Sequence, residues 1–245
     1  MQGQREGYSN DLIDEHEPKD IPQHIGYIVD GNRRWAKKHG LPTYEGHLAG
    51  YNAIQDVAKA TFDAGVPYMS AYIFSTENWK RSEEEVGKLM GLVLKMFTAD
   101  LHIFVDNNIR VKVLGSREGV DEQILREIDH AEEVTQDNTA GTLGLCFNYG
   151  GQLEIADAVR AAATAGEDMS SITPSTLEHY LYAPDMPPVD VIVRSGGDQR
   201  ISNFMLWRAA YSELVFLDNA WPDMTKEDVS SIIDTYSKRS RRFGK

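Results

Sequence analysis

Short apolar segments that alternate with amphipathic ones are the strongest constraint on the fold of this chain. Apolar runs with the length of buried strands occupy residues 25–29, 68–74, 111–114, 142–148, 189–193 and 214–216. Helical periodicity predicts helices over residues 33–38, 46–64, 82–104, 121–135, 152–165, 174–182 and 226–239. Strands that alternate with helices in this way form parallel sheets. We therefore expect a single α/β domain with a mostly parallel sheet of about six strands and helices on both faces.

The first 20 residues lack this periodicity. Residues 1–20 carry six acidic side chains and little apolar pattern, so we expect a disordered or loosely docked N-terminal tail. The folded domain should then span residues 21–245, and no repeat or linker divides it. The single cysteine, Cys146, lies in an apolar run and is expected to be an inert core thiol.

Net charge and hydropathy restrict the class of protein. A formal net charge of -13 argues against general nucleic-acid binding, which relies on positively charged surfaces. No apolar run approaches the roughly 18 to 20 residues of a membrane span, and the acidic N-terminus is unlike a signal peptide. We therefore expect a cytoplasmic protein without a membrane span.

The end of the first strand carries a candidate anion site. Asp30 and Gly31 follow the apolar run directly, and Asn32 is placed to cap the next helix. Ligands bind at the carboxyl ends of strands in open α/β sheets. A carboxylate beside a helix start and two arginines, Arg33 and Arg34, suits a metal-bound diphosphate. The alternative is that Asp30 only caps the helix and both arginines are solvated surface charges.

A second anion-binding pattern follows the strand at residues 189–193. Gly196 and Gly197 are flanked by Arg194, Arg200 and the hydroxyl group of Ser202. Backbone N–H groups of glycine-rich turns and guanidinium groups are typical ligands for phosphate oxygens. This stretch therefore predicts a second contact with an anionic substrate.

The strand at residues 68–74 ends in a polar loop, which would lie near Asp30 if the two strands are neighbours. Ser82 and Glu85 then form a capping signal for a helix whose apolar spacing continues to Phe104. Core packing is the plain interpretation of this long apolar face. The alternative is the wall of an apolar ligand tunnel, because both have the same pattern.

Several motifs in this order carry a resemblance to a known family. They are His24…Asp30-Gly31-Asn32-x-Arg34-Trp35-Ala36, Ser75-x-Glu77-Asn78-Trp79-x-Arg81, Asn148-Tyr149-Gly150-Gly151, Arg194-x-Gly196-Gly197-x-x-Arg200-x-Ser202-Asn203-Phe204 and the closing Arg242-Phe243-Gly244. With these motifs the chain resembles the cis-prenyltransferases, and within that family the bacterial undecaprenyl diphosphate synthases.

The resemblance implies an enzyme that transfers prenyl groups. Isopentenyl diphosphate would be condensed with an allylic diphosphate such as farnesyl diphosphate, with Mg²⁺ as the cofactor. The product would be a cis-polyprenyl diphosphate, undecaprenyl diphosphate for cell-wall lipid carrier synthesis. The resemblance also implies a homodimer that delivers its product to the membrane, with peripheral contact at the inner face.

The resemblance further implies roles for individual residues. Asp30 would bind Mg²⁺ together with Glu213 of the neighbouring subunit. The residues associated with catalysis would be Asp30, His47, Asn78 and Arg81. Substrate binding would involve Gly31, Asn32, Arg33, Arg34, Trp35, His47, Ser75, Glu77, Asn78, Trp79, Arg81, Arg194, Arg200, Ser202, Arg242 and Gly244.

Other interpretations stay open at this point. Thr43 stands where the family commonly has an arginine that contacts the allylic diphosphate, which puts the preferred starter in question. A shorter-chain cis-prenyl diphosphate synthase would carry the same motifs. A non-catalytic subunit of a heteromeric prenyltransferase is disfavoured because Asp30 is present. A generic nucleotide-binding protein would need a G-x-G-x-x-G or P-loop sequence after the first strand, and neither occurs there.

Overall fold

The computed structural model describes residues 20–239 of the chain. The expected N-terminal tail therefore lies outside the described residues, apart from Asp20 at its end. Arg242 and Gly244, which the family resemblance assigns to substrate binding, also lie outside them.

One parallel sheet forms the centre of the molecule. Its strands are β1 (His24–Ile28), β2 (Tyr68–Ser75), β3 (Ile109–Leu114), β4 (Gly141–Tyr149), β5 (Val191–Arg194) and β6 (Glu213–Phe216). They are ordered β3-β4-β2-β1-β5-β6, and every neighbouring pair is parallel. The six-stranded parallel sheet expected from the sequence is thus confirmed, and β1 and β2 are neighbours.

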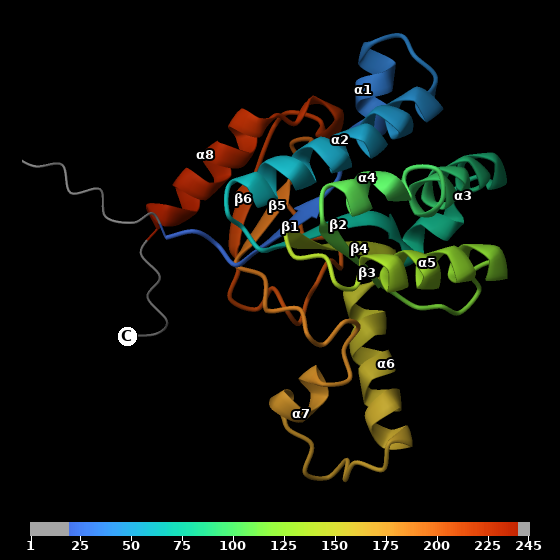
Figure 1. The fold of residues 1–245 in the computed structure, drawn as a ribbon, viewed down its shortest axis with the longest axis vertical. Helices are drawn as coiled ribbons and strands as arrows, with labels where there is room; N and C mark the ends of the chain where they lie inside the picture. The colour runs from blue at the N-terminus through green and yellow to red at the C-terminus, as the bar shows by residue number, and fades with distance from the viewer. Residues whose placement is uncertain (1–19, 240–245) are drawn as a thin grey trace, which may run out of the picture.

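Most of the helices lie between successive strands along the chain, and the last two follow β6. They are α1 (Asn32–Lys38), α2 (Thr43–Asp63), the 3-10 helix η1 (Thr76–Lys80), α3 (Glu83–Phe97), α4 (Leu101–Asp106), α5 (Glu122–Thr135), α6 (Gly151–Thr164), α7 (Pro174–Glu178), the 3-10 helix η2 (Trp221–Asp223) and α8 (Lys226–Ser237). In Figure 1 α6 and α7 project from one side of the sheet, whereas α2, α3, α4, α5 and α8 lie on the other.

The two faces of the sheet are covered unequally. The larger core packs alternate strand residues, such as Tyr27 and Phe74, against the five helices on that side. On the opposite face Tyr72 and Cys146 pack against loop residues such as Phe204. Cys146 is fully buried and unpaired, as expected, and burial raises the pKa of its thiol well above the ordinary value.

The helix expected over residues 82–104 is interrupted. Its start is as predicted, because the Ser82 hydroxyl accepts a hydrogen bond from the Glu85 N–H at 3.3 Å. At Thr98 the backbone leaves the helical region (φ -119°, ψ -87°), and α4 begins at Leu101. The apolar spacing alone did not reveal the break, because α4 resumes nearly the same periodicity and buries Leu101 and Phe104.

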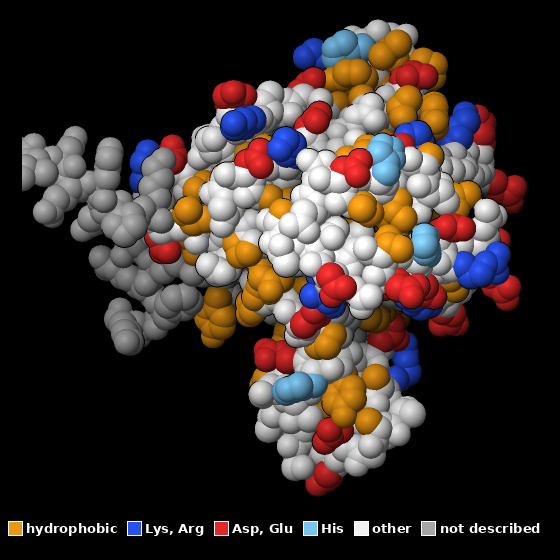
Figure 2. All heavy atoms as spheres, in the orientation of Figure 1, with side chains coloured by type: hydrophobic (Ala, Val, Ile, Leu, Met, Phe, Trp, Pro, Cys, Tyr) orange, Lys and Arg blue, Asp and Glu red, His pale blue; other side chains and the backbone are white. Residues whose placement is uncertain are grey.

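One face of the molecule carries mixed charge (Figure 2). On the face shown in Figure 2, Lys and Arg side chains are scattered among Asp and Glu side chains and do not gather into one patch. Within residues 20–239, no helix combines the length and the apolar character needed to cross a bilayer.

Candidate active site

The candidate site lies where the strand order reverses. The chain continues from β1 to β2, which pairs with one side of β1, whereas β5 pairs with the other side. In open parallel sheets this is the point where loops diverge and leave a crevice at the carboxyl edge. Ile28 at the end of β1 pairs in register with Arg194 at the end of β5, so the two predicted anion-binding segments are adjacent.

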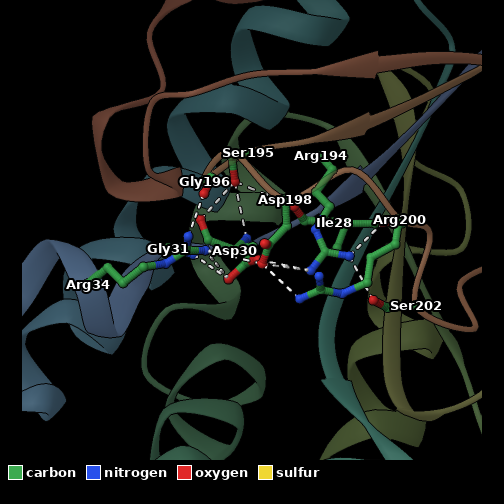
Figure 3. A network of polar contacts seen from close by, with 10 residues as sticks. All are labelled: Ile28, Asp30, Gly31, Arg34, Arg194, Ser195, Gly196, Asp198, Arg200 and Ser202. Atoms are coloured by element: carbon green, nitrogen blue, oxygen red, sulfur yellow. Dashed lines mark hydrogen bonds and ion pairs between the residues drawn. The ribbon is translucent and has the colours of Figure 1, made fainter.

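Asp30 is at the centre of a charged network (Figure 3). Its Oδ1 accepts the Gly31 N–H at 2.6 Å and lies 3.1 Å from Arg34 Nη2, and its Oδ2 accepts a hydrogen bond from Arg194 Nη2 at 2.9 Å. Partial burial by itself raises the pKa of Asp30. The bonds from Arg194 and Gly31 and the charge of Arg34 outweigh burial, so this pKa lies below its ordinary value. The carboxylate is therefore ionised at neutral pH.

Gly31 makes the turn into α1 possible. It adopts a left-handed conformation (φ 100°), and a Cβ at this position would lie 2.8 Å from the Ala220 Cβ. The expected cap by Asn32 is wrong: Gly31 is the N-cap residue, and Asn32 is already helical. The Asn32 side chain instead lies against Gly50 of α2, where an added Cβ would approach its Oδ1 to 2.5 Å.

Arg194 holds the second motif together from a buried position. Its side chain is 6% exposed, and its Nη1 donates to the carbonyl oxygen of Arg200 at 2.6 Å and to Ser202 Oγ at 2.7 Å. The guanidinium group of Arg194, at the end of β5, thus bonds both to the loop that follows this strand and to Asp30. This fork geometry fits arginine and no other side chain.

Asp198 is a site residue that the sequence analysis did not assign. Its Oδ2 lies 2.8 Å from Arg200 Nη2 and 3.6 Å from Arg34 Nη2 and from Arg194 Nη2. The acid between Gly197 and Arg200 was the available signal. In the structure Asp198 lies within ion-pair distance of Arg34, Arg194 and Arg200.

A polar cleft of about 960 Å³ surrounds this network. It is lined by Val29, Asp30, Gly31, Asn32, Arg33, Arg34, Lys37, Leu41, Pro42, Thr43, His47, Arg81, Arg194, Asp198 and Arg200. Six of these side chains are Lys or Arg, against two acids, so the cleft is locally basic within a chain of strongly negative net charge. Such a local excess attracts an anionic ligand.

A second cavity of about 110 Å³ adjoins the cleft, and most of the side chains that line it are apolar; we call it the apolar cavity. Its walls come mainly from α2, β2 and α3, and Val29, Asn32, His47 and Arg81 line both spaces. The remaining lining residues are Gly50, Tyr51, Ile54, Tyr72, Ile73, Phe74, Asn78, Leu89, Leu92, Val93 and Met96. The arrangement suits a ligand with an anionic head and an apolar tail.

Comparisons with known proteins agree with this geometry. A family model described as undecaprenyl diphosphate synthase matches residues 28–244. The chain belongs to the cis-prenyltransferase family. It is 44% identical to an isoprenyl transferase of Thermotoga maritima over 229 residues, which cover 91% of this chain and 97% of that protein.

Two further relatives place this cis-prenyltransferase among synthases of prenyl diphosphates. One is a trans,polycis-polyprenyl diphosphate synthase of Thermobifida fusca, named as specific for (2Z,6E)-farnesyl diphosphate. It is 46% identical over 231 residues, covering 91% of this chain and 81% of the relative. The other is the crystal structure of lavandulyl diphosphate synthase from Lavandula x intermedia with dimethylallyl diphosphate. It superposes with a TM-score of 0.87 at 29% identity, covering 92% of this chain and 99% of that one.

At the boundary between cleft and cavity of the cis-prenyltransferase, the buried His47 contacts a half-buried ion pair formed by Arg81 and Glu85. His47 Nε2 lies 3.1 Å from Glu85 Oε1, and Arg81 Nη1 donates to the same oxygen at 2.9 Å. Burial lowers the pKa of His47; the hydrogen bond to Glu85 opposes this, and the charges of Arg81 and Arg33 add to it. The imidazole is therefore neutral at pH 7. Glu85 was assigned only a capping role from the sequence, and its side chain instead orients two expected site residues.

Glu85→Gln is expected to lower the pKa of His47 further. The variant removes the carboxylate that raises this pKa, while the charges of Arg33 and Arg81, which lower it, remain. Titration of the His47 ring by NMR measures the shift, with the other histidines as an internal reference. A raised His47 pKa in the variant would contradict the contact described here.

The η1 segment brings only part of its motif to the site. Asn78 lines the apolar cavity, and its Oδ1 accepts the Ser75 N–H at 3.0 Å. Trp79 lines neither space: its indole N–H donates to Asn148 Oδ1 at 2.8 Å, and its ring packs edge-on against Phe74. Asn148, a motif residue without an assigned role, thus fixes the orientation of Trp79.

Three other expected site residues point elsewhere. Glu77 Oε1 accepts a hydrogen bond from Asn203, and Trp35 donates its indole N–H to Asp223 at 2.6 Å. Glu213 is at the amino end of β6, level with the start of β5, whereas Asp30 follows the carboxyl end of β1; Glu213 pairs with Arg239. Within one chain the structure does not bring Glu213 to Asp30.

Proposed function

We propose that the protein is a Mg²⁺-dependent synthase that condenses isopentenyl diphosphate with an allylic diphosphate. The allylic substrate that we propose is farnesyl diphosphate. The product that we propose is undecaprenyl diphosphate, for the synthesis of a cell-wall lipid carrier. The observation that supports this proposal is the basic cleft that opens into an apolar cavity. The family model and the farnesyl diphosphate named for the Thermobifida relative agree with it.

The cleft is suited to Mg²⁺ carried in by a substrate. Within residues 20–239, no three His, Cys, Asp or Glu side chains gather into a metal site. Mg²⁺ commonly needs only one or two carboxylates and completes its shell with phosphate oxygens and water. Asp30, ionised and reachable from the cleft, is such a carboxylate. Bound there, the ion would neutralise diphosphate charge and help the leaving group depart.

The side chains around Asp30 would bind and orient the two substrates. Arg194 and Arg200 would hold the diphosphate of isopentenyl diphosphate, with Ser202 steadying the Arg194 fork. Arg34 lines the same cleft and would contact the allylic diphosphate. The apolar cavity would exclude water from the growing hydrocarbon. His47 is neutral and lies where cleft meets cavity, so it could accept a proton there.

A homodimer would complete the site. Glu213 is at the amino end of its strand and Asp30 lies beyond the carboxyl end of β1, so a shared role in binding Mg²⁺ requires Glu213 of a second copy of the chain. We propose this arrangement, together with delivery of the product to a membrane by peripheral contact.

The test is incubation with labelled isopentenyl diphosphate, farnesyl diphosphate and Mg²⁺, with and without a chelator, followed by chain-length analysis. We expect a chelator-sensitive ladder of products ending near C55. A ladder that stops at much shorter chains would support the proposed reaction but would mean that the product is a shorter polyprenyl diphosphate. No incorporation with any allylic starter would favour a non-catalytic subunit.

Thr43→Arg is expected to lower the KM for the allylic diphosphate. Thr43 lines the polar cleft, and a guanidinium group there would add a charge-assisted contact to phosphate. A gain of about 1.4 kcal/mol corresponds to a tenfold lower KM. Steady-state kinetics with each substrate varied in turn measures the effect. A KM that stays the same would mean that another cation already serves the allylic diphosphate.

A further inference from the structure

Asn203 connects three segments that are far apart in the sequence. It directly follows Ser202 in the loop after β5, and both residues adopt left-handed conformations (φ 62° for Asn203 and 47° for Ser202). The carbonyl oxygen of Asn203 accepts the Gly151 N–H at 2.7 Å, and its Oδ1 accepts the Gln152 N–H at 2.9 Å. Both donors belong to the first turn of α6. The turn that carries Ser202 is therefore fastened to the amino end of α6.

The third segment is η1. Asn203 Nδ2 donates to Glu77 Oε1 at 3.2 Å. Glu77 belongs to η1, which also contains Asn78 of the apolar cavity. Burial by itself raises the pKa of Glu77. Hydrogen bonds from its own backbone N–H and from Asn203 outweigh burial, so this pKa lies below its ordinary value. Glu77 is therefore ionised at neutral pH and accepts a charge-assisted hydrogen bond from Asn203.

The surroundings leave the Asn203 side chain little room to move. It fills the space beside Gly150, where an added Cβ would lie 2.9 Å from its Nδ2 and 3.0 Å from Thr76 Oγ1. The next residue, Phe204, is fully buried, and its ring stacks on Tyr72 with 4.8 Å between the centroids. The loop is thus held by packing on one side of Asn203 and by hydrogen bonds at Asn203 itself.

Asn203 can influence the cleft through its neighbour Ser202 (Figure 3). Ser202 Oγ accepts a hydrogen bond from Arg194 Nη1 at 2.7 Å, and the other terminal nitrogen of Arg194 bonds to Asp30. Arg194 is only 6% exposed, so its direction depends on where these partners lie. Asn203 is not among the residues that line the cleft. A shift of its turn would therefore move Ser202 relative to Arg194 without changing the charge of the cleft.

We propose that Asn203 is a positioning residue for the isopentenyl diphosphate subsite. It fastens the turn that carries Ser202 to Glu77 and to the start of α6, and this turn holds Arg194 in the direction that binds the diphosphate. Glu77 thus acts on Arg194 through Asn203, although it lies only four residues before Arg81 in the chain. This inference rests on the proposed function, because the subsite requires that the protein use isopentenyl diphosphate.

The test compares the KM values of wild type, Asn203→Gly, Glu77→Ala and the double variant, with isopentenyl diphosphate and farnesyl diphosphate varied in turn. Glycine adopts a left-handed conformation without strain, so Asn203→Gly removes the side-chain contacts and adds no backbone strain. It should raise the KM for isopentenyl diphosphate by about tenfold, with a much smaller change for farnesyl diphosphate. Glu77→Ala should raise the same KM by less, because the contacts of Asn203 with α6 remain.

The double variant tests whether Glu77 acts through Asn203. If it does, the double variant should have nearly the KM of Asn203→Gly, and not the product of the two single effects. Glu77→Gln keeps an oxygen that can accept from Asn203, so it should recover most of the affinity lost in Glu77→Ala. A direct contact of Glu77 with substrate would instead make the single effects multiply and would leave Glu77→Gln without rescue. Either result would overturn the inference.

Asn108→Gly is the matched control. Asn108 is also left-handed (φ 54°), its Oδ1 accepts the Thr139 N–H at 3.1 Å, and its carbonyl oxygen accepts the Ala140 N–H at 2.8 Å. It precedes β3 and does not line the cleft. This variant should keep wild-type KM values, and thermal unfolding compares its stability with that of Asn203→Gly. A wild-type KM for isopentenyl diphosphate in folded Asn203→Gly would overturn the inference. No incorporation by the wild type would instead overturn the proposed function.

Discussion

Asp30→Asn is expected to lower prenyl transfer by about 10³-fold or more while the protein remains folded. The variant removes the carboxylate charge that we propose for Mg²⁺ binding. The fold should persist because asparagine retains an oxygen for the Gly31 N–H. Arg194 also retains its bonds to the Arg200 carbonyl oxygen and Ser202.

Transfer of label from isopentenyl diphosphate over a Mg²⁺ titration measures this effect, and thermal unfolding checks the fold. Asp63→Asn is the control, because Asp63 pairs with Lys59 on the exposed face of α2. The pKa of Asp30 lies below its ordinary value, so the difference between variant and wild type should persist from about pH 5 to pH 8. An active, Mg²⁺-dependent Asp30→Asn protein would contradict the metal assignment.

Arg194→Lys is expected to lower kcat/KM for isopentenyl diphosphate by about 100-fold, which corresponds to roughly 2.7 kcal/mol. Lysine keeps the charge but offers one ammonium group where the guanidinium serves three partners at once. The loss of the fork would leave Ser202 and the Arg200 loop without their common donor.

Steady-state kinetics with each substrate varied separately tests the Arg194 prediction. Arg117→Lys is the control, since Arg117 pairs with Asp129 at an exposed position outside the cleft. The KM for isopentenyl diphosphate should change much more than the KM for the allylic substrate. The opposite pattern would assign Arg194 to the allylic diphosphate.

The centre of the site could be predicted from the sequence, because its residues lie where strands end. Asp30 and Arg194 each follow a readable apolar run, and parallel strands align their carboxyl ends at one edge. The pairing of Ile28 with Arg194 then brings the two motifs together. Glycine-rich turns with arginines indicate anion binding without knowledge of the tertiary contacts.

Contacts between distant elements were beyond the reach of the sequence pattern. The break at Thr98 has no proline or glycine to mark it, and the neighbouring Asp100 is bound by Tyr51 from another helix. Glu85 looked like a capping residue because its partner His47 is on another helix and meets it only in the folded chain, although Arg81 is only four residues away. Trp79 likewise turns toward Asn148, a contact that depends on the end of β4.

Three arginines of the cleft already contact carboxylates before any ligand arrives. Asp30 and Asp198 together contact Arg34, Arg194 and Arg200 and so offset part of their positive charge. A diphosphate that binds there exchanges one set of counter-ions for another and does not simply meet bare positive charge. A single inorganic phosphate gains little from that exchange, whereas a diphosphate that brings its own metal gives the displaced carboxylate a new partner. If the proposed function holds, the site would thus favour a metal-bound diphosphate over the abundant small anions of a cell before any hydrocarbon is recognised.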